Sequence, residues 1–180
     1  RGSLEFFIEK IKIGTEKYQP YPPTNNLVEK GVILFPSLPC PYDNEEEILS
    51  EIRTFIHKYL DISEVYEQIA TYYVLFTWMY DKFNEVPYLR AIGDFGSGKS
   101  RFLQTIGVLC YKPIFTGGAT TPSPIFRIVN EVRGTLIIDE ADFKFSDMTS
   151  EIVKILNSGY QKGTPVLRSE GKGTFEVKAY

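Results

Sequence analysis

The sequence predicts an α/β fold in which helices flank a mainly parallel sheet, with a helical extension on the N-terminal side. Strand and helix patterns alternate from Pro87 onward, which is typical of parallel strands joined by crossover helices. Apolar residues recur at helical spacing between residues 45 and 83, which predicts the helical extension. Two polar clusters, residues 93–100 and 139–142, each follow a short apolar run. Since ligands of parallel sheets bind beyond the carboxyl ends of the strands, these clusters are the candidate functional residues.

The chain of 180 residues divides into three predicted parts. Residues 1–44 predict an extended, proline-rich segment, of which residues 31–43 are expected to lie extended on a surface. Residues 45–86 predict a helical subdomain, and residues 87–180 predict the α/β core, truncated at its C-terminal end. The first three residues, Arg-Gly-Ser, resemble a cloning remnant, so we expect an excised piece of a longer protein.

The composition excludes several classes of protein. With 43% hydrophobic residues, 24% charged residues and a net charge of −3, the chain is a globular domain without a wholly basic surface, so any nucleic-acid site must be local. Cys40 and Cys110 belong to no C-x-x-C pair, which argues against a zinc site or a disulfide framework and favours small apolar filler. No apolar run reaches the roughly 18 residues that span a bilayer. We therefore expect a cytoplasmic protein with no membrane partner.

Two helices are expected in the extension, at residues 45–60 and 63–83. Aromatic rings recur at helical spacing in the second helix, and such a stripe is far more often core than a surface that stacks bases. The single histidine, His57, is expected to be structural, because no cysteine, second histidine or carboxylate stands at ligand spacing from it.

The α/β core is expected to contain strands at residues 88–92, 112–116 and 135–139, and helices at residues 99–110 and 121–132. The second of these helices has proline in its first turn, where proline is best tolerated. This order of elements places both polar clusters directly after strands, where the ligands of a parallel sheet bind.

The first polar cluster is a phosphate-binding loop of the pattern G-x-x-x-x-G-K-S. Its glycines let backbone N–H groups turn toward an anion, and the following helix points its positive end at the same place. We expect Lys99 to reach the β and γ phosphates of ATP and the Ser100 hydroxyl to ligate Mg²⁺. The alternative is a purely structural glycine turn. The predicted ATP-binding residues are Gly93, Asp94, Phe95, Gly96, Ser97, Gly98, Lys99, Ser100 and Arg101.

The second polar cluster begins with an acid pair at the end of an apolar strand. Asp139 is expected to join Ser100 in holding Mg²⁺, and Glu140 is expected to orient and deprotonate the water that attacks the γ phosphate. Such a pair is typical of phosphate-loop enzymes that hydrolyse ATP rather than transfer its phosphate. Lys99 and Glu140 are therefore the predicted catalytic residues.

Four stretches carry a resemblance to a known family: GDFGSGKSRFLQTIGVLC, GGATTPSPIFRIV, GTLIIDEADF and EIVKILNSGYQKGTPVLR. With their compact spacing, residues 88–180 resemble AAA+ and superfamily 3 P-loop NTPases (ASCE class), in particular the ATPase domain of primase-helicase and replication proteins of phages, plasmids and other mobile elements. The resemblance implies an ATP-driven ring, usually a hexamer, that moves on or melts DNA. The letters DEAD at residues 139–142 also resemble DEAD-box helicases, but that family has a longer spacing and a Ser-Ala-Thr motif that residues 143–180 lack.

The C-terminal stretch predicts a helix at residues 148–160 and a β-hairpin whose strands, 164–169 and 174–180, flank the turn EGKG. In helicases of superfamily 3 and of the minichromosome maintenance type, a hairpin of this kind enters the central channel. The candidate DNA-binding residues are Arg168, Lys172 and Lys178. An ordinary exposed hairpin is an equal alternative.

Two parts of the family pattern are missing. The resemblance implies a further strand, with a polar sensor residue, between the strands of the two clusters. Either residues 164–168 are that strand, or the sheet lacks it, which is the interpretation we favour. The resemblance also implies an arginine finger from a neighbouring subunit, for which Arg127 and Arg133 are candidates by charge alone.

The predicted function is an ATP-binding, Mg²⁺-dependent, ATP-hydrolysing motor of a replicative DNA helicase. Its expected partners are single-stranded DNA in a ring pore and further copies of the chain, in the cytoplasm and associated with the nucleoid during replication. One alternative is a protein-remodelling or nucleotide-switch ATPase that does not translocate on DNA. Another is an assembly module that binds ATP without hydrolysing it.

Overall fold

The structure is a computed structural model, and it describes residues 11–18, 26–37, 39–117, 120–139, 156–157, 159–163, 166–170 and 173–177. The described helices are α1 (Asn26–Glu29), α2 (Glu45–Tyr59), α3 (Glu64–Trp78), α4 (Lys99–Gly107) and α5 (Pro122–Val132), with a 3₁₀ helix at Tyr80–Lys82. The described strands are β1 (Ile11–Ile13), β2 (Glu16–Tyr18), β3 (Ile114–Gly117), β4 (Leu136–Asp139), β5 (Val166–Glu170) and β6 (Gly173–Val177).

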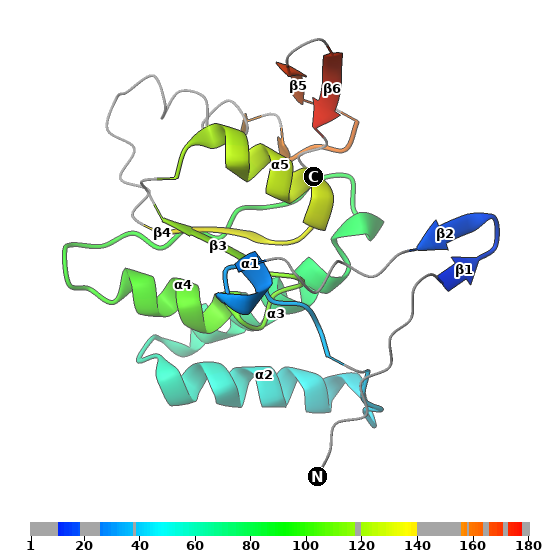
Figure 1. The fold of residues 1–180 in the computed structure, drawn as a ribbon. Helices are drawn as coiled ribbons and strands as arrows, with labels where there is room; N and C mark the ends of the chain where they lie inside the picture. The colour runs from blue at the N-terminus through cyan, green and yellow to red at the C-terminus, as the bar shows by residue number, and fades with distance from the viewer. Residues whose placement is uncertain are drawn as a thin grey trace.

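Helices enclose a pair of parallel strands. β3 and β4 pair in parallel, with Ile114 opposite Leu136 and Gly117 opposite Asp139. Figure 1 shows α5 on one side of this pair and α4 on the other, with α2 and α3 beyond α4. The pairs β1–β2 and β5–β6 are antiparallel. The mainly parallel P-loop sheet stays a prediction, because the described residues form one parallel pair.

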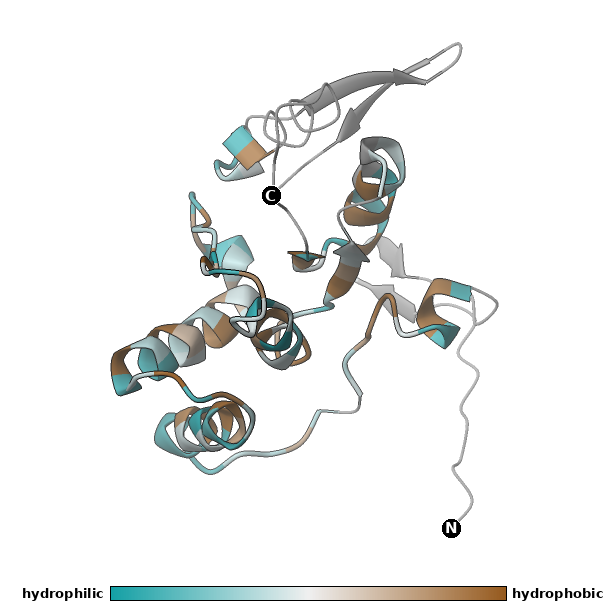
Figure 2. Ribbon diagram, turned by 90° about the vertical axis from the view of Figure 1, so that its left-hand side faces the viewer, coloured by the Kyte–Doolittle hydropathy of each residue, from teal (hydrophilic) through white to brown (hydrophobic). Residues whose placement is uncertain are grey.

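Helix α2 begins at a reciprocal cap. The Asn44 side chain accepts a hydrogen bond from the Glu47 N–H at 2.9 Å, and the Glu47 carboxylate accepts one from the Asp43 N–H at 3.2 Å. These bonds satisfy N–H groups that a helix start leaves without partners. The helix predicted at residues 45–60 is confirmed. Figure 2 shows brown hydrophobic and teal hydrophilic residues on the helices, as expected of helices that bury one face.

The larger apolar core lies where α2, α3 and α4 meet. Ile56 of α2 is fully buried, and Val74 of α3 and Ile106 of α4 are 1% and 3% exposed. On its other side, α4 lies close to the sheet, since a Cβ at Gly107 would come within 2.5 Å of Ile137 Cδ1. The absence of a side chain at Gly107 therefore lets the helix approach the parallel strands. The buried residues of this core are Ile56, Leu60, Ala70, Val74, Ile106 and Cys110.

A smaller core joins the N-terminal segment to β3 and α5. Ile33 and Ile114 are fully buried and form a β-bridge with each other, and they pack with Val132 of α5. The Phe115 N–H donates to the Val32 carbonyl at 2.8 Å. Ile33 thus covers the edge of β3 that faces away from β4. Part of the segment predicted to be extended is helical, since α1 spans Asn26–Glu29.

Two predicted elements differ from the structure. Residues 88–92 form no strand, because no described strand pairs with them and a strand requires a ladder of backbone hydrogen bonds. Helix α3 ends at Trp78 rather than at residue 83, and the chain continues as the 3₁₀ turn. Most of the helix predicted at residues 148–160 lies outside the described residues.

Candidate nucleotide-binding site

The glycine loop leads directly into α4. Gly96 and Gly98 have φ angles of 78° and 87°, in the left-handed region that favours glycine. Gly98 is the N-cap of α4, and no side chain caps this end of the helix. The first N–H groups of α4 are therefore left for a ligand, and an anion is the ligand that a helix N-terminus favours.

Lys99 closes the loop with its own side chain. Its Nζ donates to the carbonyl oxygens of Gly93 and Asp94 at 2.6 and 2.7 Å. The loop is tight at this point, since a Cβ at Gly93 would stand 2.6 Å from Ser97 Oγ. The ammonium group is therefore held at the loop by neutral carbonyls, where its positive charge remains available to an anion.

The other loop residues face solvent. Asp94, Ser100 and Arg101 are exposed. Phe95 is 105% exposed and Ile92 is 84% exposed. Their apolar side chains therefore stand at the rim of the loop without being packed.

Strand β4 brings Asp139 to the end of the sheet at which α4 begins. Figure 1 shows β3 and β4 ending on the left, where the loop before α4 also lies. Asp139 is the last residue of β4, lies opposite Gly117 and is half-buried. The next residue, Glu140, which is predicted to deprotonate the attacking water, lies outside the described residues.

The residues present suit a magnesium-bound triphosphate. Backbone N–H groups at a helix start and an ammonium group suit phosphate oxygens. The Ser100 hydroxyl and the Asp139 carboxylate supply oxygen ligands of the kind that Mg²⁺ prefers.

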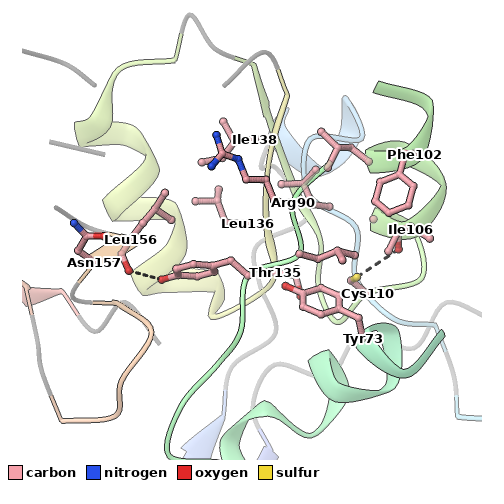
Figure 3. Close-up of a pocket in the computed structure, with 15 residues that line it drawn as sticks. Tyr73, Arg90, Phe102, Ile106, Cys110, Thr135, Leu136, Ile138, Leu156 and Asn157 are labelled. Carbon is pink, nitrogen blue, oxygen red and sulfur yellow. Dashed lines mark hydrogen bonds between the residues drawn. The ribbon is translucent and has the colours of Figure 1, made fainter. Parts of the chain in front are cut away.

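A pocket of about 380 Å³ lies between the segment before the loop, α4 and β4. Figure 3 shows Leu156 and Asn157 on one side of it and Phe102, Ile106 and Cys110 on the opposite side. The Tyr88 hydroxyl donates to the Leu156 carbonyl at 2.7 Å, and Cys110 Sγ contacts the Ile106 carbonyl at 3.4 Å. Burial raises the pKa of Cys110 to about 11. The thiol therefore stays protonated at neutral pH, as apolar filler would.

The pocket runs along an edge of β4 that no described strand covers. The Ile114 N–H donates to the Thr135 carbonyl at 2.9 Å, so the β3-facing backbone groups of this strand belong to alternate residues. The backbone groups of Leu136 and Ile138 consequently point to the other side, and both residues line the pocket.

A carboxylate partner of His57 was missed by the sequence analysis. His57 Nδ1 lies 2.6 Å from Oε1 of Glu67, which is on the facing helix α3. This contact joins α2 to α3, which agrees with the structural role expected of His57. The two residues are ten positions apart on different helices, so only the packing of α2 on α3 reveals the pair.

The C-terminal hairpin is formed, but two of its three candidate DNA-binding residues lie outside the described residues. β5 and β6 pair in antiparallel fashion, with Arg168 opposite Phe175. Among the described strands β5 pairs only with β6, so the described residues 166–168 do not pair with β4. Lys172 and Lys178 are the candidates that fall outside the described part.

Of the two candidate arginine fingers, Arg127 is exposed on α5 and Arg133 ends that helix with a φ of 51°.

Comparison with protein-family models, with curated proteins and with solved structures finds no match. In the part of the chain that the structure describes, no helix has both the length and the apolar character needed to cross a membrane.

Proposed function

We propose that the chain is an ATP-binding and Mg²⁺-dependent ATP-hydrolysing motor domain of a replicative DNA helicase. The observation that carries this proposal is the arrangement of Lys99. Its ammonium lies on the carbonyls of Gly93 and Asp94, at the N-terminus of an uncapped helix. A cation, free N–H groups and a helix dipole meet in one glycine loop, and together they attract a polyphosphate.

Each site residue has a role that its chemistry permits. Bound ATP supplies the phosphoanhydride bond whose hydrolysis releases the energy for movement. Lys99 neutralises charge on the phosphates, and Ser100 with Asp139 supplies oxygen ligands for Mg²⁺. Glu140 orients the attacking water and accepts its proton.

The use of this energy on DNA rests on the hairpin and on the resemblance to mobile-element replication proteins. Arg168 lies in β5, opposite Phe175 of β6. Cations on a hairpin in a ring of copies suit the phosphates of a single strand. In this proposal the working form is a homo-oligomeric ring, a hexamer, in the cytoplasm.

Phosphate release tests the hydrolysis step. With Mg²⁺ and ATP, we expect Glu140→Gln to lower the rate by about 10²-fold or more, the usual contribution of a general base. Asp142→Asn removes a second carboxylate from the same cluster and is expected to leave the rate within about threefold. Equal release by wild type and Glu140→Gln contradicts the role of Glu140, and no release by either favours an assembly module.

Salt-dependent binding of a labelled single-stranded oligonucleotide tests the hairpin. Replacing Arg168 and Lys172 by alanine removes two cations. The slope of the logarithm of affinity against the logarithm of salt concentration is expected to flatten by about 1.4, at about 0.7 per phosphate contact. An unchanged slope contradicts the DNA role of the hairpin and favours the remodelling or nucleotide-switch ATPase.

A further inference from the structure

A cluster of aromatic and basic side chains lies at the end of the sheet opposite the glycine loop. Tyr111 and Lys112 are separated from the start of β3 by one residue, and Arg133 lies shortly before β4. Because β3 and β4 are parallel, these residues share the amino end of the sheet. Trp78 and Tyr80 join them from the end of α3 and the following turn. We call this set, Trp78, Tyr80, Tyr111, Lys112 and Arg133, the Trp78 face.

The aromatic rings of the Trp78 face form one connected group. The rings of Trp78 and Tyr111 lie 5.3 Å apart edge to face, and those of Tyr80 and Tyr111 lie 6.2 Å apart. Trp78 Nε1 donates to the Leu109 carbonyl at 2.9 Å. The indole is thus fixed by a hydrogen bond, yet its side chain remains accessible, since Trp78 is 46% exposed. An exposed ring held in place is suited to stacking, because little conformational freedom is lost on binding.

Two basic residues belong to the turns beside these rings. Lys112 Nζ lies 5.1 Å from the centre of the Tyr111 ring and 3.5 Å from the Val132 carbonyl. Arg133 is exposed, and its carbonyl accepts a hydrogen bond from the Tyr80 hydroxyl at 3.5 Å. The Lys112 ammonium therefore lies over one tyrosine ring, and the backbone of Arg133 is bonded to the other tyrosine.

Both cations occupy backbone positions that usually belong to glycine. Lys112 and Arg133 have φ angles of 42° and 51°, and they are the non-glycine residues with positive φ in the described part of the chain. The two turns are in close contact, since a Cβ at Gly134 would come within 2.0 Å of the Lys112 carbonyl oxygen. Strained residues of this kind gather at binding sites, where their side chains are needed in a set direction.

Nearby carboxylates leave a positive balance. Asp81 is paired with Lys82, whose Nζ lies 3.8 Å from its Oδ2. The Lys162 ammonium also reaches this turn, donating to the Asp81 carbonyl at 3.3 Å. Glu131 is the other acid close in sequence to Arg133. The Trp78 face thus gathers cations within a chain whose net charge is −3.

We propose that the Trp78 face binds single-stranded nucleic acid. Bases would stack on the exposed Trp78 ring, and phosphates would contact Lys112 and Arg133, which is how sequence-tolerant single-strand sites combine rings with cations. The residues of this face belong neither to the glycine loop nor to the C-terminal hairpin. Binding at this face needs neither ATP nor a ring of copies. The proposal is therefore independent of the proposed motor function.

Trp78 is the only tryptophan in the sequence, so its fluorescence reports on this face alone. In the nucleotide-free chain at low salt, an oligothymidylate of about 12 nucleotides is expected to quench this fluorescence in a saturable way. Lys112→Gln with Arg133→Gln is expected to weaken the apparent affinity by about tenfold and to flatten its salt slope by about 1.4. Circular dichroism and the emission spectrum of the free variant establish that it is folded.

Matched controls locate the effect. Lys30→Gln with Lys58→Gln removes the same charge from exposed positions that do not belong to the Trp78 face. This pair is expected to leave the quenching curve unchanged. Arg168→Ala with Lys172→Ala, in the hairpin, is also expected to leave it unchanged. Absence of quenching, equal quenching by polyglutamate, or equal weakening by the Lys30 and Lys58 pair would each overturn the proposal. If the double variant at Lys112 and Arg133 does not fold, the test is the affinity of a labelled oligothymidylate for folded Trp78→Ala, measured with Arg168 and Lys172 already replaced by alanine. Affinity equal to that of the hairpin variant alone overturns the proposal.

Discussion

His57 Nδ1 lies 2.6 Å from Glu67 Oε1, and this contact joins α2 to α3. Arg53 of α2 approaches the other carboxylate oxygen, with its Nε at 3.4 Å. The Glu67 side chain is only 4% exposed. Its hydrogen bond to His57 and the nearby Arg53 hold the pKa of Glu67 below its usual value of 4.5, while burial acts in the opposite direction. The carboxylate is therefore stabilised in its charged form by two residues of the facing helix.

This lowered pKa predicts a loss of stability in acid. When a carboxyl group has a lower pKa folded than unfolded, its contribution is fully present above the unfolded pKa and disappears as the pH falls through the folded pKa. We expect the urea midpoint of wild type to fall as the pH drops below about 4.5, and to fall less in Glu67→Gln. Urea denaturation at pH 7 and pH 3.5 measures both.

Glu64→Gln is the matched control for this prediction, because the Glu64 side chain is 88% exposed and lies 4.0 Å from Arg53. It is expected to lose stability in acid as wild type does. If the urea midpoint of Glu67→Gln falls as much as that of wild type between pH 7 and pH 3.5, the Glu67 carboxylate is not the cause of the acid sensitivity.

Gly134 is predicted to tolerate no side chain. A Cβ there would stand 2.0 Å from the Lys112 carbonyl oxygen, which is backbone and cannot rotate away. We expect Gly134→Ala to lower the free energy of unfolding by about 1 to 3 kcal/mol, as overpacking does. Gly117→Ala is the control, since nothing lies within 4 Å of its added Cβ. Equal midpoints for the two variants in urea would show that the turns before β3 and β4 are not in contact.

The N-terminal segment is predicted to belong to the folded core. Ile33 is fully buried against Ile114, so Ile33→Ala is expected to lower the free energy of unfolding by about 2 to 5 kcal/mol. Val28→Ala changes a neighbouring residue that is 37% exposed, and its effect is expected to stay within about 0.5 kcal/mol. A small effect for both, measured by urea denaturation, would mean that residues 31–35 are a linker.

The elements with strong periodicity were predictable from sequence. Helices α2 and α5 have an apolar face at helical spacing, and β3 and β4 are short apolar runs with turn residues around them. The segment at residues 88–92 has the same apolar character but forms no strand, because a strand depends on a partner that local sequence does not encode. The position of Ile33 under the edge of β3 likewise depends on a distant segment.

The candidate site was predictable in its residue types but not in its details. The glycine pattern located the loop and the start of α4 at Lys99. It did not reveal that the Lys99 ammonium lies on two loop carbonyls, nor that Phe95 stands fully exposed beside it. The left-handed Lys112 and Arg133 were not predictable either, because local sequence assigns such positions to glycine.

ATP binding by the chain tests the central claim most directly. We expect isothermal titration calorimetry in the presence of Mg²⁺ to show saturable ATP binding by wild type, weakened by at least about tenfold in Lys99→Ala, because the phosphates lose the cation of the loop. Lys58→Ala removes an exposed ammonium from α2 and is expected to bind ATP as wild type does. Binding of equal strength in wild type and Lys99→Ala, or no binding by folded wild type, would contradict the assignment of the glycine loop as a nucleotide site.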